Sequence, residues 1–293
     1  MSESAVVRAA VLGSPISHSK SPQLHAAAYR YLGLEADYTR IELTEAEAAC
    51  FLGEAAGFTG FSVTMPLKAV MVDHMTAVSD RVATLGVLNT ITVEDAEAGP
   101  AALFGENTDV CGITAALRGA GLGQADGSSF AVIGAGGTAA AALAAAADLG
   151  FSSVKVYARS PARGAAAVPL ARRLGLEAEI RYMDQLPADI AGFGLGALVS
   201  TLPPKAADAL AAELESVQWV PPLLDVAYDP WPSALATRWE ATGGPVASGL
   251  EMLLHQAVRQ VELFTASTAR PAAALNLTDH AQMVAQMRAA VEL

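Results

Sequence analysis

Short apolar runs alternate with longer amphipathic segments along most of the 293-residue chain. The runs have the length of buried strands, and several of the segments between them repeat apolar residues every three or four positions, as helices do. Strands that alternate with helices form mostly parallel sheets covered on both faces, so the pattern predicts an α/β fold. Strands are expected at residues 6–12, 38–43, 58–64, 130–133, 154–157, 178–182, 196–200, 223–227 and 245–247.

Local signals mark where helices begin. Ser21 and Pro22 predict a helix with a serine cap and a proline in its first position, running to Gly33. Thr44 and Glu47 have the spacing of a capping box at the start of another helix. Further helices are expected to begin at Pro66 and after Asp109, to cover 137–149 and 161–174, and to fill the tail from about Leu250.

The alternation stops and restarts, which predicts two domains. The polar segment 94–100 is expected to be a hairpin-like excursion, and the loop 119–128 is interpreted as the domain junction. Strands and helices alternate again after this loop, as is typical of a doubly wound nucleotide-binding domain. The chain length also suits two domains of roughly 100–200 residues each.

Composition and charge narrow the possible functions. Apolar residues make up 53% of the chain and charged residues 16%, which excludes a disordered protein. The net charge of −12 argues against binding to nucleic acid or anionic membranes, which requires clustered Lys and Arg. The uncharged run 128–147 is rich in Ala and Gly, so it is interpreted as strand, turn and helix rather than a membrane span. Without a recognisable signal peptide, a cytoplasmic protein is expected.

The two cysteines, Cys50 and Cys111, belong to no CxxC or Cys/His cluster. Their positions therefore suggest neither a zinc site nor a disulfide framework, and both are expected to be buried thiols. No cluster of metal ligands is evident elsewhere in the sequence, so we expect no metal.

A glycine-rich turn follows the expected strand at 130–133. Its residues Gly134, Ala135, Gly136, Gly137 and Thr138 begin the pattern G-x-G-x-x-A directly before a helix. Such glycines allow a sharp turn and let backbone N–H groups at the helix N-terminus approach a pyrophosphate. In this strand–turn–helix context, the motif predicts a dinucleotide-binding site.

The end of the next expected strand distinguishes NADP from NAD. An acidic residue there would bind the 2′-hydroxyl of NAD, but this chain has Ala158, Arg159 and Ser160, with Arg163 one helical turn later. Two guanidinium groups and a hydroxyl suit a phosphate dianion, although they could also be solvated residues at a helix start. We therefore expect NADP(H) as the cofactor.

Polar residues also follow the expected strands of the first domain, where open α/β sheets bind ligands. Each has an ordinary structural explanation when taken singly: Ser21 could cap a helix, Asn89 could form a turn and Lys68 could be a surface cation. The whole set is Ser19, Ser21, Thr64, Lys68, Asn89 and Asp109.

Taken together and in this order, these segments resemble the shikimate dehydrogenases. The resemblance covers nearly the whole chain, although many relatives have asparagine where this chain has Ser62. It is carried by GSPISHSKSPQLH (13–25), GFSVTMPLK (60–68), GVLNT (86–90), GENTD (105–109), VIGAGGTAAA (132–141), YARSPAR (157–163), STLP (200–203), DVAYDP (225–230) and SGLEMLLHQA (248–257).

The resemblance implies an oxidoreductase that transfers a hydride between NADP and carbon 3 of shikimate, reversibly reducing 3-dehydroshikimate. This reaction belongs to the pathway to chorismate and the aromatic amino acids. Lys68 and Asp109 are implied to be the catalytic pair, because an ammonium group can stabilise the charge that develops on the substrate oxygen. Shikimate or 3-dehydroshikimate would be the partner of a monomer or homodimer.

The same resemblance assigns binding residues. Ser19, Ser21 and Tyr228 are implied to bind the substrate carboxylate, and Thr64, Asn89 and Gln256 its ring hydroxyls. The residues implied to bind the cofactor are Asp80, Gly134, Ala135, Gly136, Gly137, Thr138, Ala158, Arg159, Ser160, Arg163, Thr201, Val226, Gly249 and Met252.

The implied architecture has a shikimate-binding catalytic domain, residues 1–112 plus 250–293, and an NADP-binding Rossmann domain, residues 113–249. The first is an α/β/α domain with a mostly parallel sheet, and the C-terminal helices return to pack on it. Two alternatives stay open: a catabolic quinate/shikimate dehydrogenase, which Arg159 disfavours, and a non-catalytic shikimate-binding regulator.

Overall fold

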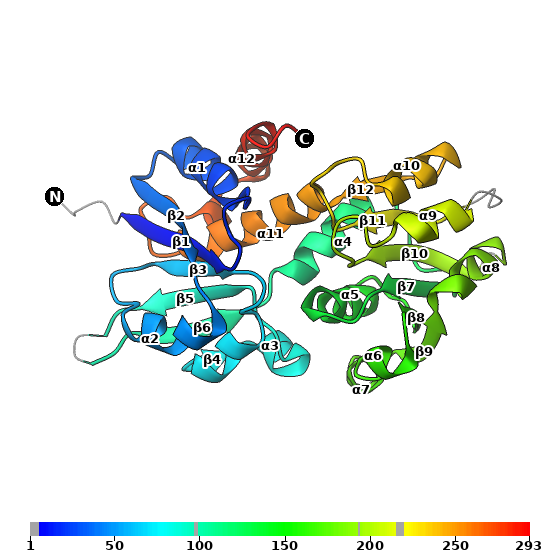
Figure 1. Ribbon diagram of the computed structural model, residues 1–293. Helices are drawn as coiled ribbons and strands as arrows, with labels where there is room; N and C mark the ends of the chain where they lie inside the picture. Colours follow the sequence, from blue (N-terminus) through cyan, green and yellow to red (C-terminus); the bar gives the residue numbers. More distant parts are fainter. Residues whose placement is uncertain (1–5, 97–98, 193, 215–219) are drawn as a thin grey trace. The chain divides into compact units, whose positions relative to one another are not determined.

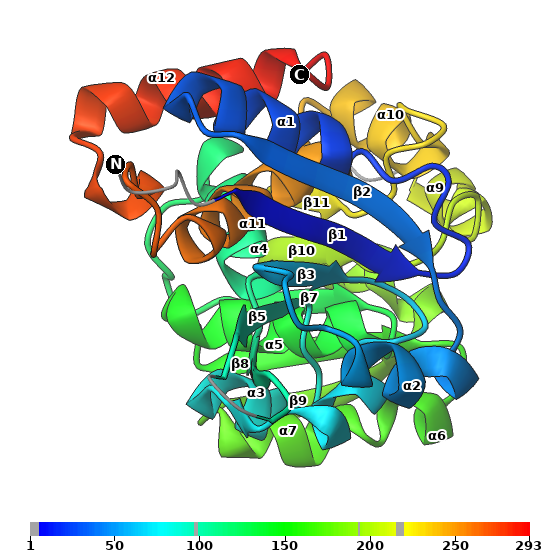
Figure 2. The ribbon, with the colours of Figure 1, turned by 90° about the vertical axis from the view of Figure 1, so that its left-hand side faces the viewer.

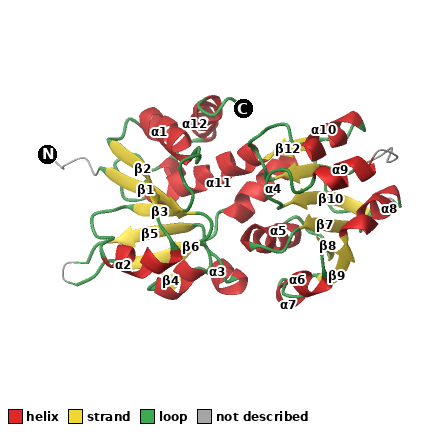
Figure 3. Cartoon of the chain, in the orientation of Figure 1, coloured by secondary structure: helices red, strands yellow, loops and turns green. Residues whose placement is uncertain are grey.

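The computed structural model describes residues 6–96, 99–192, 194–214 and 220–293, with helices and strands alternating along the chain as predicted (Figures 1 and 3). The residues pack into two compact units. The first comprises Met1–Thr108 and Gln256–Leu293, and the second comprises Asp109–His255. The units divide after residue 108 and after residue 255, whereas the sequence analysis placed the limits after residues 112 and 249.

The first unit contains a six-stranded mixed sheet in the order β2-β1-β3-β5-β6-β4. β1 pairs in parallel with β2 and β3, while β5 runs antiparallel to β3 and β6. The connection between β5 and β6 is the hairpin-like excursion expected at 94–100, of which 97–98 lie outside the described residues. The strands are β1 (Val7–Gly13), β2 (Ala36–Glu42), β3 (Gly60–Val63), β4 (Ala77–Val78), β5 (Thr90–Glu94) and β6 (Ala102–Glu106).

Several helices of this unit begin or end at recognisable capping residues. α1 (Ser21–Leu32) has proline in its first turn and ends at Gly33, whose φ of 68° allows a left-handed cap. α12 (Leu277–Ala289) lies beside α1, so the C-terminal helices do pack on the first unit (Figure 2). The remaining helices are η1 (Glu45–Glu47), α2 (Ala48–Gly53), η2 (Val70–His74), α3 (Asp80–Leu85), η5 (Ala272–Ala274) and the part of α11 (Gly249–Phe264) from Gln256 onward.

The second unit contains a six-stranded sheet in the order β12-β11-β10-β7-β8-β9, with every described pairing parallel. Read from β9, this is the 3-2-1-4-5-6 order of a doubly wound dinucleotide-binding fold. The predicted fold class is therefore confirmed. The strands are β7 (Ser129–Ile133), β8 (Ser153–Ala158), β9 (Glu177–Tyr182), β10 (Leu195–Ser200), β11 (Leu223–Asp225) and β12 (Val246–Ser248).

Helices of the second unit pack around this sheet. α4 (Asp109–Gly119) packs against α5 (Gly137–Asp148), so the loop 119–128 lies inside the second unit and is not the junction that we predicted. The other helices are α6 (Pro161–Gly164), α7 (Ala167–Arg173), η3 (Met183–Gln185), α8 (Leu186–Ala191), α9 (Asp208–Glu213) and α10 (Ala234–Ala241).

The predictions at two helix starts differ from the structure. Lys20, rather than Ser21, occupies the cap position of α1, because Ser21 is already the first residue of the helix, and Lys20 makes no side-chain cap. No regular helix begins at Pro66; turns lead instead to the 3₁₀ helix η2. One reason is that the Lys68 carbonyl accepts a hydrogen bond from the Leu88 N–H, at 2.9 Å, rather than from a residue one turn later. The capping box of Thr44 and Glu47 is confirmed, although it opens a 3₁₀ turn.

The helix expected at 161–174 is divided into α6 and α7. Pro169 has no N–H to donate to the carbonyl of residue 165, and its ring would collide with that carbonyl in a continuous helix. The cysteine prediction is also wrong, since Cys50 and Cys111 are both exposed. Each lies between the buried positions of its helix and points away from the core.

Each unit has its own hydrophobic core. Phe61, Met71 and Ile91 are among the fully buried residues of the first core, and Ile133, Leu198 and Trp239 among those of the second. Within the described ranges, no helix has both the length and the apolar character needed to cross a membrane.

Candidate active site

Four connections of the first unit meet at one edge of its sheet. β1 and β3 are parallel, so the segments after Gly13 and Val63 leave at the same edge. β5 is antiparallel to β3 and begins at this edge, and β6 is antiparallel to β5 and ends there. The topology thus gathers most of the predicted substrate-side residues at one sheet edge.

Asn89 lies at the centre of this edge and is only 2% exposed. Its side-chain amide donates to Gln256 Oε1 at 3.1 Å and to Thr108 Oγ1 at 3.0 Å. Its Oδ1 accepts from the Thr108 backbone N–H at 2.7 Å and from Thr90 Oγ1 at 2.9 Å. Two of the predicted residues, Asn89 and Gln256, are therefore in direct contact although 167 positions separate them.

Thr64 and Lys68 lie on the connection after β3. The Thr64 N–H donates to the Leu12 carbonyl at 2.9 Å, which holds this connection beside the end of β1. The carbonyl of Lys68 bonds to Leu88, the neighbour of Asn89. Both Thr64 and Lys68 are half-buried. Asp109, 4% exposed, is the first residue of α4 and belongs to the second unit, so its pairing with Lys68 stays a prediction.

The two predicted carboxylate-binding serines surround the start of α1. The Ser21 backbone N–H donates to Ser19 Oγ at 3.3 Å, and Arg40 fixes the loop by donating to the Ser19 carbonyl at 2.6 Å and 3.0 Å. The Ser21 hydroxyl also bonds to Tyr38. Burial raises the pKa of Tyr38, so its phenol stays protonated.

In the second unit, a cavity of about 450 Å³ lies at the carboxyl edge of the parallel sheet. The ends of β7, β8, β9 and β10 meet there, which is where doubly wound sheets bind ligands. Predicted cofactor residues line this cavity together with residues that the sequence analysis missed. The lining residues are Gly134, Ala135, Gly136, Tyr157, Ala158, Arg159, Met183, Thr201, Leu202 and Pro203.

Two glycines permit close backbone approaches in this unit. Gly134 has a φ of 112°, and a side chain there would also collide with the hydroxyl of Thr201. Thr201 in turn donates from its N–H and its hydroxyl to the Ile133 carbonyl, each at 2.8 Å, which joins the loops after β7 and β10. At Gly249, a β-carbon would collide with the Val226 carbonyl, so only glycine fits between β11 and α11.

The other predicted cofactor residues occupy different positions. Gly137 and Thr138 form the first turn of α5, and the exposed Arg159 is followed by the half-buried Ser160. Met252 is buried on α11. Arg163 lies on α6, but its side chain is outside the described part of the structure.

Asp80 and Tyr228 each belong to a different unit from the residues with which they were grouped. Asp80 is exposed in the first turn of α3, in the first unit, whereas the cavity lies in the second. Tyr228 is half-buried in the second unit, whereas Ser19 and Ser21 belong to the first. Burial raises the pKa of Tyr228, and the negative charge of the neighbouring Asp229 raises it further.

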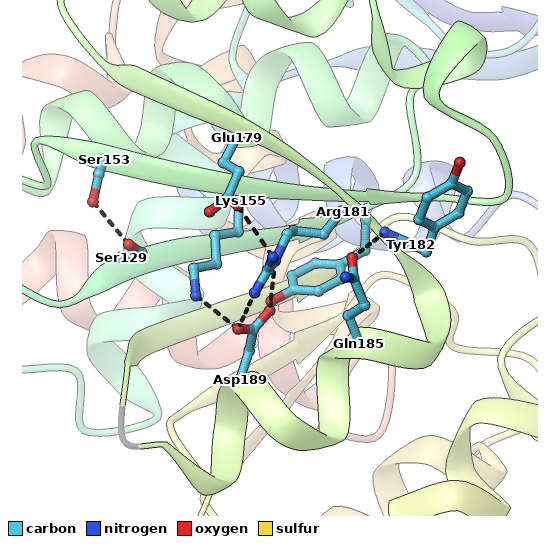
Figure 4. Close-up of polar contacts among 9 residues, drawn as sticks. Ser129, Ser153, Lys155, Glu179, Arg181, Tyr182, Gln185 and Asp189 are labelled. Carbon is cyan, nitrogen blue, oxygen red and sulfur yellow. Dashed lines mark hydrogen bonds and ion pairs between the residues drawn. The ribbon is translucent and has the colours of Figure 1, made fainter.

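Tyr157 lines the cavity and bonds to a charged cluster. Figure 4 shows the charged members of this cluster, Lys155, Arg181 and Asp189. Asp189 on α8 accepts hydrogen bonds from Tyr157 Oη at 2.7 Å, Lys155 Nζ at 2.9 Å and Arg181 at 2.7 and 3.0 Å. Burial raises the pKa of Asp189, but these three donors outweigh it and hold the pKa well below its usual range. The cluster joins α8 to β8 and β9, and sequence reasoning missed it because its members are far apart in the chain.

Sequence reasoning also missed the polar residues beneath Asn89. Gln260 is fully buried, and one signal could have identified it: it lies four positions after Gln256, on the same face of α11. His25 is also fully buried, and its ring stacks on Tyr38 with centroids 4.0 Å apart. Burial lowers the pKa of His25 to about 3, and the hydrogen bond with Gln260 offsets only part of this shift.

Family models and a curated relative match both the first and the second unit of the chain. A family model described as the shikimate dehydrogenase substrate binding domain matches residues 11–91, and one described as the shikimate 5'-dehydrogenase C-terminal domain matches 249–273. Shikimate dehydrogenase (NADP(+)) from Paramagnetospirillum magneticum is 34% identical over 256 residues, which cover 85% of this chain and 89% of the relative.

Solved structures extend the likeness to three dimensions. Shikimate dehydrogenase from Mycobacterium tuberculosis superposes with a TM-score of 0.80 at 37% identity, covering 95% of this chain and 99% of the other. Shikimate 5-dehydrogenase from Thermus thermophilus, in complex with NADP(H) and shikimate, gives a TM-score of 0.74 at 28% identity, covering 97% and 99%. The chain belongs to the shikimate dehydrogenase family.

Proposed function

We propose that the protein is an NADP-dependent shikimate dehydrogenase that reversibly reduces 3-dehydroshikimate to shikimate, an oxidoreductase acting on a CH–OH group. One observation carries the proposal: Arg159 and the glycine turn Gly134–Gly136 line one cavity in a chain whose relatives are NADP(+)-dependent shikimate dehydrogenases. The protein would act in the pathway to chorismate and aromatic amino acids. The proposal includes a cytoplasmic location and a monomer or homodimer whose partners are small molecules.

The second unit, 109–255, would bind NADP(H). The backbone N–H groups of the glycine turn and the first turn of α5 suit the pyrophosphate, because a helix N-terminus attracts anions. The Arg159 guanidinium and the Ser160 hydroxyl would hold the 2′-phosphate, assisted by Arg163. Ala158, Thr201, Val226, Gly249 and Met252 would complete the contacts, together with Asp80 from the first unit.

The first unit, 1–108 with 256–293, would bind the substrate. Hydroxyl donors from Ser19 and Ser21 suit a carboxylate, and Tyr228 would add a phenol donor from the second unit. Thr64, Asn89 and Gln256 would hydrogen-bond the ring hydroxyls. Because a buried amide left without a partner is costly, Asn89 and Gln256 would discriminate against substrates that lack those hydroxyls.

Lys68 and Asp109 would perform the acid–base work. When bound, NADP(H) supplies or accepts the hydride at carbon 3. The Lys68 ammonium would lie at the oxygen on that carbon, where it stabilises developing negative charge and can donate a proton during reduction. In the reverse direction, Lys68 would take the proton from the substrate hydroxyl. Asp109 would orient both Lys68 and a neighbouring hydroxyl.

Initial rates of NADP reduction with shikimate test this proposal, with quinate replacing shikimate and NAD replacing NADP in parallel assays. We expect fast turnover only when shikimate is paired with NADP. Preference for quinate or NAD would instead indicate a catabolic quinate/shikimate dehydrogenase. Shikimate binding without turnover in any combination would indicate a regulator and would contradict the proposal.

A further inference from the structure

A buried chain of polar side chains runs beneath Asn89 and involves none of the residues assigned to chemistry. Gln260 Nε2 donates to the Asn89 carbonyl at 3.1 Å and to Thr90 Oγ1 at 3.0 Å. On its other side, Gln260 Oε1 lies 2.7 Å from Ser62 Oγ and 3.3 Å from His25 Nε2. Both donors and the acceptor of this fully buried amide are therefore used.

The backbone carbonyl of Asn89 fixes the direction of every hydrogen bond in this chain of polar side chains. A carbonyl only accepts, so Gln260 must present its NH₂ to Asn89 and its oxygen to Ser62 and His25. Ser62 must then donate to Gln260, and it accepts from the Tyr38 hydroxyl at 2.6 Å. One proton arrangement satisfies the chain from Tyr38 to Asn89.

The same logic fixes the state of His25. Its Nε2 must carry the proton that bonds to Gln260, so its Nδ1 accepts from the Tyr29 hydroxyl at 3.0 Å. Complete burial disfavours the charged imidazolium, which agrees with a ring that stays neutral. Among the described residues, Tyr29 and Tyr38 are titratable side chains that contact this ring, and burial raises the pKa of each.

We propose that Gln260 is a positioning residue for substrate binding: it holds the Asn89–Thr90 segment so that the Asn89 amide meets the ring hydroxyls. This inference rests on the proposed function and deepens it. Gln256 contacts the side chain of Asn89, while Gln260, one helical turn later, holds its backbone and the Thr90 hydroxyl that bonds to Asn89 Oδ1. Helix α11 thus fixes Asn89 from two successive turns.

The substitution Gln260→Glu tests this role because its chemistry changes with pH while its shape does not. A protonated carboxyl still has one donor for the Asn89 carbonyl and an acceptor for Ser62 and His25. An ionised carboxylate has no donor, so it repels the backbone carbonyl of Asn89. This holds whichever neighbouring group or water accepts the proton that the carboxyl loses. Burial raises the pKa of such a carboxyl, so the change should fall above the ordinary value of about 4.3.

The measured quantity is the ratio of the variant's KM for shikimate to that of the unchanged enzyme at each pH. We expect a ratio near one at low pH that rises about tenfold as the carboxyl ionises, with a smaller change in kcat and no change in KM for NADP. Gln286→Glu, the same change at an exposed position of α12, is the matched control and should give a flat ratio. A flat ratio for Gln260→Glu as well would overturn the proposal.

Thr90→Val is the second variant, since valine keeps the shape of threonine and replaces its hydroxyl with a methyl group. It should raise the KM for shikimate severalfold at every pH. The Thr90 hydroxyl that donates to Asn89 Oδ1 and accepts from Gln260 Nε2 would be gone, so both amides lose a partner. An unchanged KM in a folded Thr90→Val variant would also reject the positioning role, even if Gln260→Glu did not fold. If the unchanged protein shows no turnover, both the proposed function and this inference are rejected. If it turns over normally and both variants keep its KM for shikimate at every pH, the inference alone is rejected.

Discussion

At the scale of single residues, the proposed preference for NADP over NAD depends on Arg159, the residue directly after β8. Its guanidinium lines the cavity of the second unit and has the planar donor geometry that a phosphate requires. We expect Arg159→Ala to raise the KM for NADP by roughly 10–100-fold and to leave the KM for NAD nearly unchanged, since only NADP carries the 2′-phosphate. Steady-state kinetics with both cofactors measures this. Arg172→Ala, at an exposed position of α7, is the control, and equal losses for both cofactors would contradict the assignment.

Lys68 is the residue on which the proposed chemistry depends. Removing the ammonium in Lys68→Met should lower kcat by about 10²–10⁴-fold, the usual contribution of a general acid–base group. The affinity for NADP should change little, because Lys68 is not among the residues that line the cofactor cavity. Stopped-flow turnover and fluorescence titration with NADPH separate the two effects. A variant that loses cofactor binding as strongly as turnover would show that Lys68 acts otherwise.

Residues with a local motif were predictable from sequence, whereas residues defined by tertiary contacts were not. The glycine turn and Arg159 follow strands directly, so their shared cavity could be expected from chain order alone. Tyr38 and His25 carry no such signal, because each meets its partners only after β2 and α1 pack together. The buried support of the site is therefore the part that a single sequence does not reveal.

At the scale of elements, the Asp189 cluster ties α8 to β8 and β9. The Asp189 side chain is 9% exposed, so replacing its charge leaves Lys155 and Arg181 without their shared partner. Asp189→Asn should lower the free energy of unfolding by roughly 1–3 kcal/mol at neutral pH, less than for a fully buried pair because both cations are partly solvated. Urea unfolding followed by circular dichroism measures this. Asp184→Asn, an exposed carboxylate on η3, should have little effect.

The pH dependence of this effect gives a second check on the cluster. The pKa of Asp189 is lower in the folded protein than in the unfolded chain, so the carboxylate stabilises the fold at pH values above its unfolded pKa of about 3.9. That contribution is lost as the pH falls through the folded pKa. The stability difference between the unchanged protein and Asp189→Asn should therefore be constant near neutral pH and shrink in acid. A difference that grew on acidification would contradict the ion-pair explanation.

The element predictions failed where a local signal competed with a tertiary contact. Pro66 is an ordinary helix-start signal, but the contact between Lys68 and Leu88 draws that segment into turns. The break between α6 and α7, by contrast, could have been predicted from Pro169, which fits in the first turn of α7 but not in the middle of one helix spanning 161–174. Strand positions were more predictable, because the apolar runs of the central strands β3, β7 and β10 are buried at nearly every position.

At the scale of the whole molecule, the chain leaves the first unit at Thr108 and returns to it at Gln256. The proposed assignment of one ligand to each unit predicts how each ligand should change amide hydrogen exchange. Binding restricts local opening around the contacts that a ligand makes, so protection should appear first at the binding edge of the sheet concerned. NADP should slow exchange in the turn 134–138 and at the end of β8, whereas shikimate should slow it around Ser21 and Asn89.

Mass spectrometry of the whole chain, exchanged with each ligand alone and with both, can read the two units independently. The segment from Gln256 onward is the informative region, because it follows the second unit in sequence but packs with the first. We expect shikimate to protect residues 256–264 and NADP to leave them nearly unchanged. Protection of this segment by NADP alone would contradict the assignment of residues 256–293 to the substrate unit. Because each ligand is proposed to contact groups that the other does not, this test does not depend on whether the enzyme turns over under the conditions of exchange.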